Sequence, residues 1–406
     1  MAPLISIAIP TRERGRYLTH CLETTLRCDA HKVEVVVSDN ASLDASFIDD
    51  PRFASVRFIR QANRLPMAAN FEAAFAGCSG DYIVYVGDDD AVIPSGIADL
   101  IAVVEARRPD VVSWPSPHYF WPTAGENGSL TIKRRQVRGG VTDQDPREIM
   151  RLVWGGLWGN NTVYCGCVSR ALVERVRARC GRLFYHGYAD ARNYGLIALA
   201  QTYLYLNRPV TLYGRSPAST ASALASPGSA GHAAWRAENS NEVGRRNLDM
   251  ASRCVPAYAL DSLLTTVDLL GLVEPAIDMD RWRARIVAWI ASMSEAEHPR
   301  ELEIVNAWMG AIGQTPVSIP VGRRAAATGG GTWRRPSLGK VTLTTTPTFL
   351  ANSASAVGAV EHLLGVEQLA EQETWLAAAT RWGRVVVRAN ALRSGIASVP
   401  DDRAST

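Results

Sequence analysis

The stretch GDYIVYVGDDDAVIP, residues 80–94, indicates both the fold class and the candidate site. Residues 82–86 form an apolar run, rich in β-branched and aromatic side chains, that suits a buried strand and is too short for a helix. Three consecutive carboxylates follow, at Asp88, Asp89 and Asp90. Adjacent carboxylates repel one another, so they favour water or a divalent cation. The stretch predicts either a cation-binding loop at a strand end or an acidic surface turn.

The same strand pattern recurs on both sides of this stretch. Strand-like runs occur at residues 4–9, 33–37, 56–59 and 111–114, with helical patterns between them. This alternation predicts an α/β fold, with a mainly parallel sheet flanked by helices. Loops at the carboxyl ends of such strands meet at one crevice, so we expect residues 10–16, 39–44 and 88–90 to lie together. The absence of GxGxxG and GxxxxGK(S/T) motifs disfavours dinucleotide-binding and P-loop folds.

Composition limits the class of protein. The chain has 406 residues, of which 47% are hydrophobic, and this length suggests two or three domains. The net charge of +3 does not indicate a nucleic-acid partner. Seven cysteines without a CxxC pair indicate reduced thiols. The sequence shows neither a leader-like segment nor an apolar run of membrane-spanning length. We therefore expect a cytoplasmic location.

Four segments together resemble a known family. They are ISIAIPT at 5–11, VSDNASLD at 37–44, NRLPMAAN at 63–70 and YIVYVGDDDAVIP at 82–94. In this order they resemble a family 2 glycosyltransferase with the GT-A fold, over residues 4–210. The resemblance implies an enzyme that uses a nucleotide sugar. It also implies that this donor is contacted by Pro10, Thr11, Arg12, Asp39, Asn40, Arg64, Asn70, Asp88 and Asp89. Asp44 is a weaker candidate for the same role.

The family's DxD motif implies a divalent cation, Mn²⁺ or Mg²⁺, at Asp88, Asp89 and Asp90. Gly87 stands where many members have the first Asp. Either Asp89 therefore takes the metal-binding position and Asp90 the acidic position after it, or Asp88 and Asp90 form the DxD. A hard cation would stabilise the nucleoside diphosphate that leaves when the sugar–phosphate bond breaks. Basic residues on nearby loops are candidates to assist, or are solvated surface charges: Arg12, Arg14, Arg16 and Arg64. Leu65 is a second departure, because the family often has Gly there.

An inverting transferase also needs a general base for the acceptor hydroxyl. The family places it in an acidic element at a helix start, and the resemblance implies Asp190, although Ala189 replaces the preceding Glu. The alternative is that Asp190 only interacts with the helix dipole. His186 is a competing base, and a lone His is more often structural. Aromatic side chains between residues 114 and 164 indicate an acceptor-side wall or a packed core.

The predicted organisation has five parts. They are a GT-A domain at 1–213, a linker or lid at 214–232, a helical domain at 233–313, a flexible loop at 314–340 and a C-terminal helical segment at 341–406. Basic residues near the end of that last segment suggest either peripheral contact with an anionic membrane or packing, within the chain or in a homodimer.

The expected function is therefore metal-dependent, inverting sugar transfer. The donor is a nucleotide sugar, and the acceptor is a hydroxyl of a glycan or a lipid-linked molecule. Two alternatives stay open at this point: a sugar-nucleotide pyrophosphorylase, which would need a more Gly-rich first loop, and an inactive GT-A module that binds a glycan or a partner.

Overall fold

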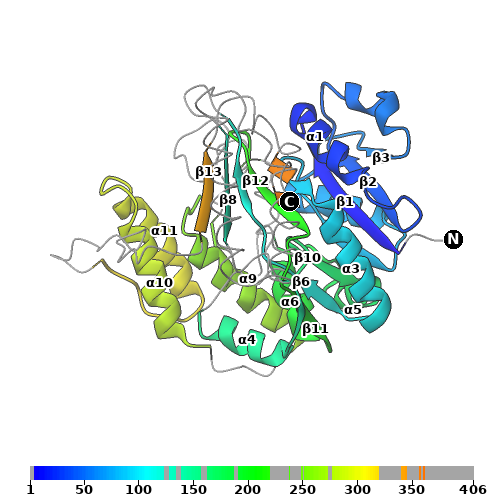
Figure 1. Cartoon of the computed structure of the whole chain (residues 1–406). Helices are drawn as coiled ribbons and strands as arrows, with labels where there is room; N and C mark the ends of the chain where they lie inside the picture. Colours follow the sequence, from blue (N-terminus) through cyan, green and yellow to red (C-terminus); the bar gives the residue numbers. More distant parts are fainter. Residues whose placement is uncertain are drawn as a thin grey trace, which may run out of the picture.

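Two sheets and a helical unit make up the part of the protein that the structure describes (Figure 1). The computed structural model describes residues 4–122, 128–133, 139–156, 162–186, 191–219, 237, 248–249, 251–272, 277–319, 340–344, 356–357 and 360–361. Among the helices that it describes, none has the length and apolarity needed to cross a bilayer.

The larger sheet has eight strands in the order β3-β2-β1-β4-β10-β6-β11-β9. Its parallel part contains β1 (Ile5–Thr11), β2 (Val33–Asp39), β3 (Arg57–Arg60) and β4 (Tyr82–Tyr85). The remaining strands are β10 (Gly166–Ser169), antiparallel to both neighbours, β6 (Val111–Ser113), β11 (Tyr203–Leu206) and the edge strand β9 (Val141–Gln144). The predicted α/β fold is confirmed.

One strand is longer than the sequence predicts, because β1 continues through Pro10 and Thr11, which were expected in a loop. Pro10 lacks an N–H, so proline is excluded where both strand edges are paired. Pairing of β1 with β4 ends at Ala8, while Pro10 and Thr11 pair only with β2. The missing donor is therefore tolerated at this position.

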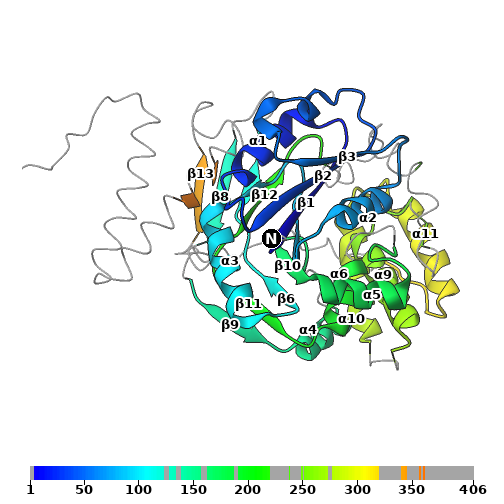
Figure 2. The same ribbon diagram turned by 90° about the vertical axis from the view of Figure 1, so that its right-hand side faces the viewer.

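Helices cover both faces of the larger sheet (Figure 2). On one face, α1 (Gly15–Thr25) and α3 (Pro94–Arg107) pack against alternate strand residues such as Ile7 and Val35. On the other face, Ala8 and Val36 belong to a core shared with α2 (Met67–Gly77), α5 (Arg170–Cys180) and α6 (Ala191–Leu199). Because successive side chains of a strand point to opposite faces of the sheet, each strand contributes residues to the cores on both faces.

The helical unit packs into the core that contains α2, α5 and α6. It consists of α9 (Val255–Leu270), α10 (Met279–Ala291) and α11 (His298–Ala311), and α9 contacts α5, α6 and α10. All three helices lie in the predicted range 233–313. The short helix α4 (Pro146–Trp154) contacts α6. Because α9 contacts both α6 and α5, these two helices join the helical unit to the first 213 residues.

The smaller sheet lies beside the aspartate triplet. It has the order β13-β8-β7-β12-β5 and contains β5 (Ala91–Val92), β7 (His118–Phe120), β8 (Ser129–Lys133), β12 (Thr211–Arg215) and β13 (Lys340–Thr344). Residues 341–344 were expected in a helical segment and are a strand, because they pair antiparallel with β8. Likewise Gly214 and Arg215 end a strand and do not begin a linker.

Candidate active site

The aspartate triplet lies at the carboxyl end of β4, next to the carboxyl end of β1. A turn follows the strand, in which the Asp90 N–H donates to the Gly87 carbonyl at 3.1 Å. The side chains are buried, with exposed fractions of 3% for Asp88, 5% for Asp89 and 2% for Asp90. The alternative of a solvated acidic turn is therefore wrong.

Asp88 is bound by the last residue of β1 and by a residue of the loop after it. Thr11 Oγ1 donates to Asp88 Oδ2 at 2.8 Å. Arg14 Nη1 donates to Asp88 Oδ1 at 3.0 Å, which makes an ion pair. The Asp88 charge raises the pKa of Arg14 above its ordinary value, so the guanidinium stays charged. As predicted from the strand order, the loops after β1 and β4 meet in space.

Asp89 and Asp90 are bound by the chain around the end of β12. The Gly214 N–H donates to Asp90 Oδ1 at 2.6 Å, and the Gly87 N–H donates to Asp90 Oδ2 at 2.8 Å. Ser216 donates to Asp89 Oδ2 from its N–H at 3.1 Å and from its Oγ at 2.6 Å. We call residues 214–219 the strap, because they bind Asp89 and Asp90 through these contacts and accept a hydrogen bond from Arg14, the partner of Asp88, at the Ala218 carbonyl.

Burial makes the triplet electrostatically unfavourable. Loss of hydration raises the pKa of Asp89, and the neighbouring Asp88 charge raises it further. Burial raises the pKa of Asp90 well above its ordinary value, and the Asp89 charge adds to this effect. Backbone donors of Gly214 and Gly87 oppose the shift at Asp90 by stabilising its charged form. The site therefore favours additional positive charge.

The donor atoms suit a hard cation, because Mn²⁺ and Mg²⁺ prefer carboxylate oxygens. Within the described residues the triplet has one ion pair, to Arg14, for three carboxylates, and no described donor reaches Asp89 Oδ1. The same part of the chain contains no three His, Cys, Asp or Glu side chains arranged around one point as metal ligands. The charge and chemistry of the triplet fit a divalent cation, but its carboxylates are directed to separate partners and do not form a ready ligand cluster.

Asp39 and Asn40 lie at the carboxyl end of β2, where the nucleotide is predicted to bind, and they hold the neighbouring loops by hydrogen bonds. Asp39 is fully buried and accepts hydrogen bonds from the Ser42 N–H at 3.3 Å to each oxygen. Asn40 pairs with the backbone of Leu65 through its Oδ1, at 2.7 Å, and its Nδ2, at 2.9 Å. Leu65 is not among the described residues with positive φ, so its position does not require glycine.

The other residues predicted to contact the nucleotide-sugar donor differ in how deeply they are buried. Asn70 is buried and binds Ser38, whose Oγ donates to Asn70 Oδ1 at 2.8 Å, so Asn70 joins α2 to β2. Arg64 is half exposed and forms an ion pair with Glu13 at 3.3 Å. Arg12 lies half buried after β1. Asp44 is exposed and accepts from the Ser46 N–H at 3.0 Å, as expected for a turn residue.

Comparison with known proteins identifies the family. Residues 6–176 match the family model described as Glycosyl transferase family 2. The glycosyltransferase GlyG of Streptococcus pneumoniae serotype 4 (strain ATCC BAA-334 / TIGR4) is 30% identical over 230 residues, which cover 54% of this chain and 73% of that relative. The chain belongs to glycosyl transferase family 2. The predictions of family and of a glycosyltransferase enzyme are confirmed.

Solved structures show more distant likeness to this family 2 member. S. aureus TarS (residues 1–349) in complex with UDP-GlcNAc is 12% identical, covers 76% of this chain and 87% of that chain, and gives a TM-score of 0.45. The mannosyltransferase PcManGT from Pyrobaculum calidifontis, in complex with GDP-Man and Mn²⁺, is 11% identical, covers 77% and 86%, and gives 0.36. The family assignment does not depend on either likeness.

The predicted general base of this family 2 chain, Asp190, lies outside the described residues. The competing candidate His186 is described and is buried, with 2% exposure. Its Nε2 lies 2.6 Å from Asp261 Oδ2 on α9, and its Nδ1 lies 3.2 Å from Ser262 Oγ. Trp308 of α11 donates from Nε1 to Asp261 Oδ1 at 3.1 Å. His186 thus belongs to a buried network that joins the transferase domain to the helical unit.

A buried arginine also flanks the site. Arg192, in the first turn of α6, has 3% exposure. Its guanidinium carbon lies 5.7 Å from the ring centre of Tyr85, at the end of β4, and 5.4 Å from that of Phe184. Aromatic faces stabilise a cation that has lost its hydration. The sequence prediction did not include Arg192, because the stacking partners lie in separate segments.

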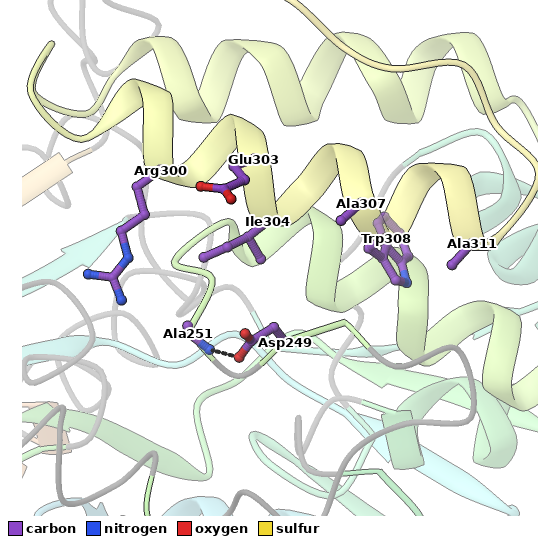
Figure 3. Close-up of a pocket in the computed structure, with 8 residues that line it drawn as sticks. All are labelled: Asp249, Ala251, Arg300, Glu303, Ile304, Ala307, Trp308 and Ala311. Atoms are coloured by element: carbon purple, nitrogen blue, oxygen red, sulfur yellow. Dashed lines mark hydrogen bonds between the residues drawn. The ribbon is translucent and has the colours of Figure 1, made fainter.

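A cavity of about 470 Å³ lies in the helical unit (Figure 3). Its lining comes from α11 and from residues next to the start of α9: Asp249, Ala251, Arg300, Glu303, Ile304, Ala307, Trp308 and Ala311. Arg300 and Glu303 lie toward one end of the row along α11, while Ala307, Trp308 and Ala311 line the other (Figure 3). No residue of the predicted donor site contributes to this lining, so we do not assign the cavity to sugar transfer.

The partners of the triplet on the strap were not predictable from the local sequence. Trp121 Nε1 donates to the Asp89 carbonyl at 2.8 Å, and Gly214 approaches so closely that an added Cβ would lie 1.7 Å from the same oxygen. These residues are far from the triplet in sequence and belong to no motif. Among the described side-chain partners of Asp88, Thr11 lay in a segment that carries the resemblance, and Arg14 was one of the basic loop residues considered as candidates to assist.

Proposed function

We propose that this chain is a metal-dependent, inverting glycosyltransferase that moves a sugar from a nucleoside diphosphate donor to a hydroxyl of a glycan or lipid-linked acceptor. The observation that supports the proposal most directly is the buried triplet at the carboxyl end of β4 in a family 2 member. Open α/β sheets bind ligands at this edge.

Within the proposal, Asp88, Asp89 and Asp90 are the residues that would hold Mn²⁺ or Mg²⁺. The bound cation would offset the charge that develops on the diphosphate leaving group. Asp39 and Asn40 fix the loops after β2 and before α2, where the nucleoside is proposed to bind. Asp190 is proposed to accept the proton of the attacking hydroxyl, as a general base does.

The proposal is tested with a panel of nucleotide sugars, by measuring nucleoside diphosphate release with Mn²⁺ and with chelator. Asp89→Asn is expected to lower Mn²⁺-dependent release at least about 100-fold, because it removes charge stabilisation from the leaving group. Asp49→Asn is the control, since Asp49 is an exposed carboxylate elsewhere. Equal rates of nucleoside diphosphate release in Mn²⁺ and in chelator would contradict metal dependence. Binding of the nucleotide sugar without any release would favour an inactive module.

The base assignment has its own experiment. Asp190→Asn is expected to abolish transfer while donor binding is retained, and full transfer by this variant would refute the assignment. A cytoplasmic location, contact with a membrane surface and homodimer formation are further predictions. They are measured by fractionation, vesicle sedimentation and light scattering.

A further inference from the structure

Arg14 is the described residue that brings positive charge onto the triplet. Its Nη1 lies 3.0 Å from Oδ1 of Asp88, which is 3% exposed, while the arginine side chain is 22% exposed. Removal of water strengthens such a pair, so the guanidinium is held firmly on this oxygen. Asp88 is also one of the residues that would hold a divalent cation in the proposed function.

Arg14 has a second contact, which connects it to the strap. Its Nη2 donates to the carbonyl of Ala218. Ser216, two residues earlier on the strap, donates twice to Asp89, and Gly214 donates to Asp90. The guanidinium therefore bridges the first aspartate and the segment that binds the other two. Loss of its contact to Asp88 would remove one of the described links between the strap and the triplet.

A divalent cation and this guanidinium would compete for the same carboxylate. Thr11 donates to Asp88 Oδ2 and Arg14 to Oδ1, so both oxygens already have one donor. A cation bound to Asp88 would repel the guanidinium at this short distance. Entry of the cation at Asp88 is therefore expected to weaken the contact between Arg14 and Asp88.

We infer that Arg14 is a built-in counter-ion of the triplet, which competes with the divalent cation for Asp88 and turns to the donor diphosphate once displaced. The inference rests on the proposed function, since it needs a cation and an anionic donor. A donor diphosphate in this site would be a favourable partner for a displaced guanidinium, because arginine binds phosphate oxygens through paired hydrogen bonds.

The inference predicts effects of opposite sign in one variant, Arg14→Gln. The affinity for Mn²⁺ alone rises about tenfold, because no charge-assisted hydrogen bond has to be broken first. The affinity for uridine or guanosine diphosphate at saturating Mn²⁺ falls about tenfold, because a charged phosphate contact is lost. A purely structural role for Arg14 would weaken both.

The experiment is isothermal titration calorimetry, with Mn²⁺ alone and then with each diphosphate in saturating Mn²⁺. Arg16→Gln is the matched control, because it removes the same charge from the same region. Arg16 lies over the ring of Tyr17, at 4.4 Å from the ring centre, and has no described contact with the triplet. Its Mn²⁺ affinity is expected to stay within about twofold of the unmodified chain.

The outcomes separate this inference from the proposed function. An unmodified chain that binds no Mn²⁺ refutes the metal dependence and the inference with it. Mn²⁺ binding by the unmodified chain, with equal or weaker affinity in Arg14→Gln, overturns the inference alone. Should Arg14→Gln be unfolded in chelator, recovery of its circular dichroism on adding Mn²⁺ supports the inference, since the cation then replaces the guanidinium. Failure to recover contradicts it.

Discussion

Replacement of Asp261 by alanine tests whether the buried network holds the helical unit on the transferase domain. Asp261 is 1% exposed and accepts from Trp308 Nε1 at 3.1 Å, while its other oxygen lies 2.6 Å from His186 Nε2. An ionised carboxylate only accepts hydrogen bonds, so His186 donates to it. The variant leaves two buried donors without their acceptor.

The expected loss follows from those two donors. Each buried unsatisfied donor costs about 1–3 kcal/mol, so the free energy of unfolding should fall by about 2–6 kcal/mol. The assay is urea unfolding followed by circular dichroism and by tryptophan fluorescence.

Asp268→Ala provides the comparison, because Asp268 is exposed on the same helix and an exposed substitution changes stability by about 0.5 kcal/mol or less. Trp308→Phe, alone and combined with Asp261→Ala, completes a double-mutant cycle. Residues in contact give coupling energies of about 0.5–3 kcal/mol. A loss below about 1 kcal/mol in Asp261→Ala, or additive effects in the cycle, would refute the assigned role of the network.

Two further predictions concern other parts of the fold. In Gly214→Ala the new Cβ would lie 1.7 Å from the Asp89 carbonyl, so the melting temperature should fall. Gly310→Ala has no heavy atom within 4 Å of the new Cβ, and it should stabilise helix α11 by up to about 1 kcal/mol; equal melting temperatures for these two variants would contradict the close approach. Glu34 is the pH-sensitive group: burial favours its neutral form, but hydrogen bonds, led by Ser6 and Ser79, outweigh burial and lower its pKa. The stability that ionised Glu34 contributes is therefore present above the unfolded-state pKa and is lost as the pH falls through the lower folded-state pKa. Glu34→Gln should then flatten the acid side of a plot of melting temperature against pH. An unchanged slope would contradict the assignment of Glu34 as the pH-sensitive group.

The parallel half of the larger sheet was predictable, because each strand there is a local apolar run followed by a turn. Residues 82–86 show why the triplet was also predictable: a buried strand has to deliver the next side chains to the sheet edge. Strand β10 was not predicted, since Gly166–Ser169 is short and its place between β4 and β6 depends on pairing with distant strands.

The environment of the triplet was harder to predict than its position. The sequence suggested free carboxylates ready for a cation, whereas Ser216 and Gly214 bind two of them from across the molecule. The pairing of β12 with β5 brings those donors to the site, and no local pattern encodes it. Asn40 is a similar case, because its fit to the Leu65 backbone depends on how two loops approach each other.

The late position of β13 has a consequence for biosynthesis. Lys340 pairs with Lys133 of β8, so the outer strand of the smaller sheet emerges from the ribosome roughly 10–40 s after its partner, at about 5–20 residues per second. Throughout that interval β8 presents an open edge, which is a template for association with other nascent chains. Successful production of the enzyme should therefore depend on protection of this edge by a chaperone until translation has passed residue 344.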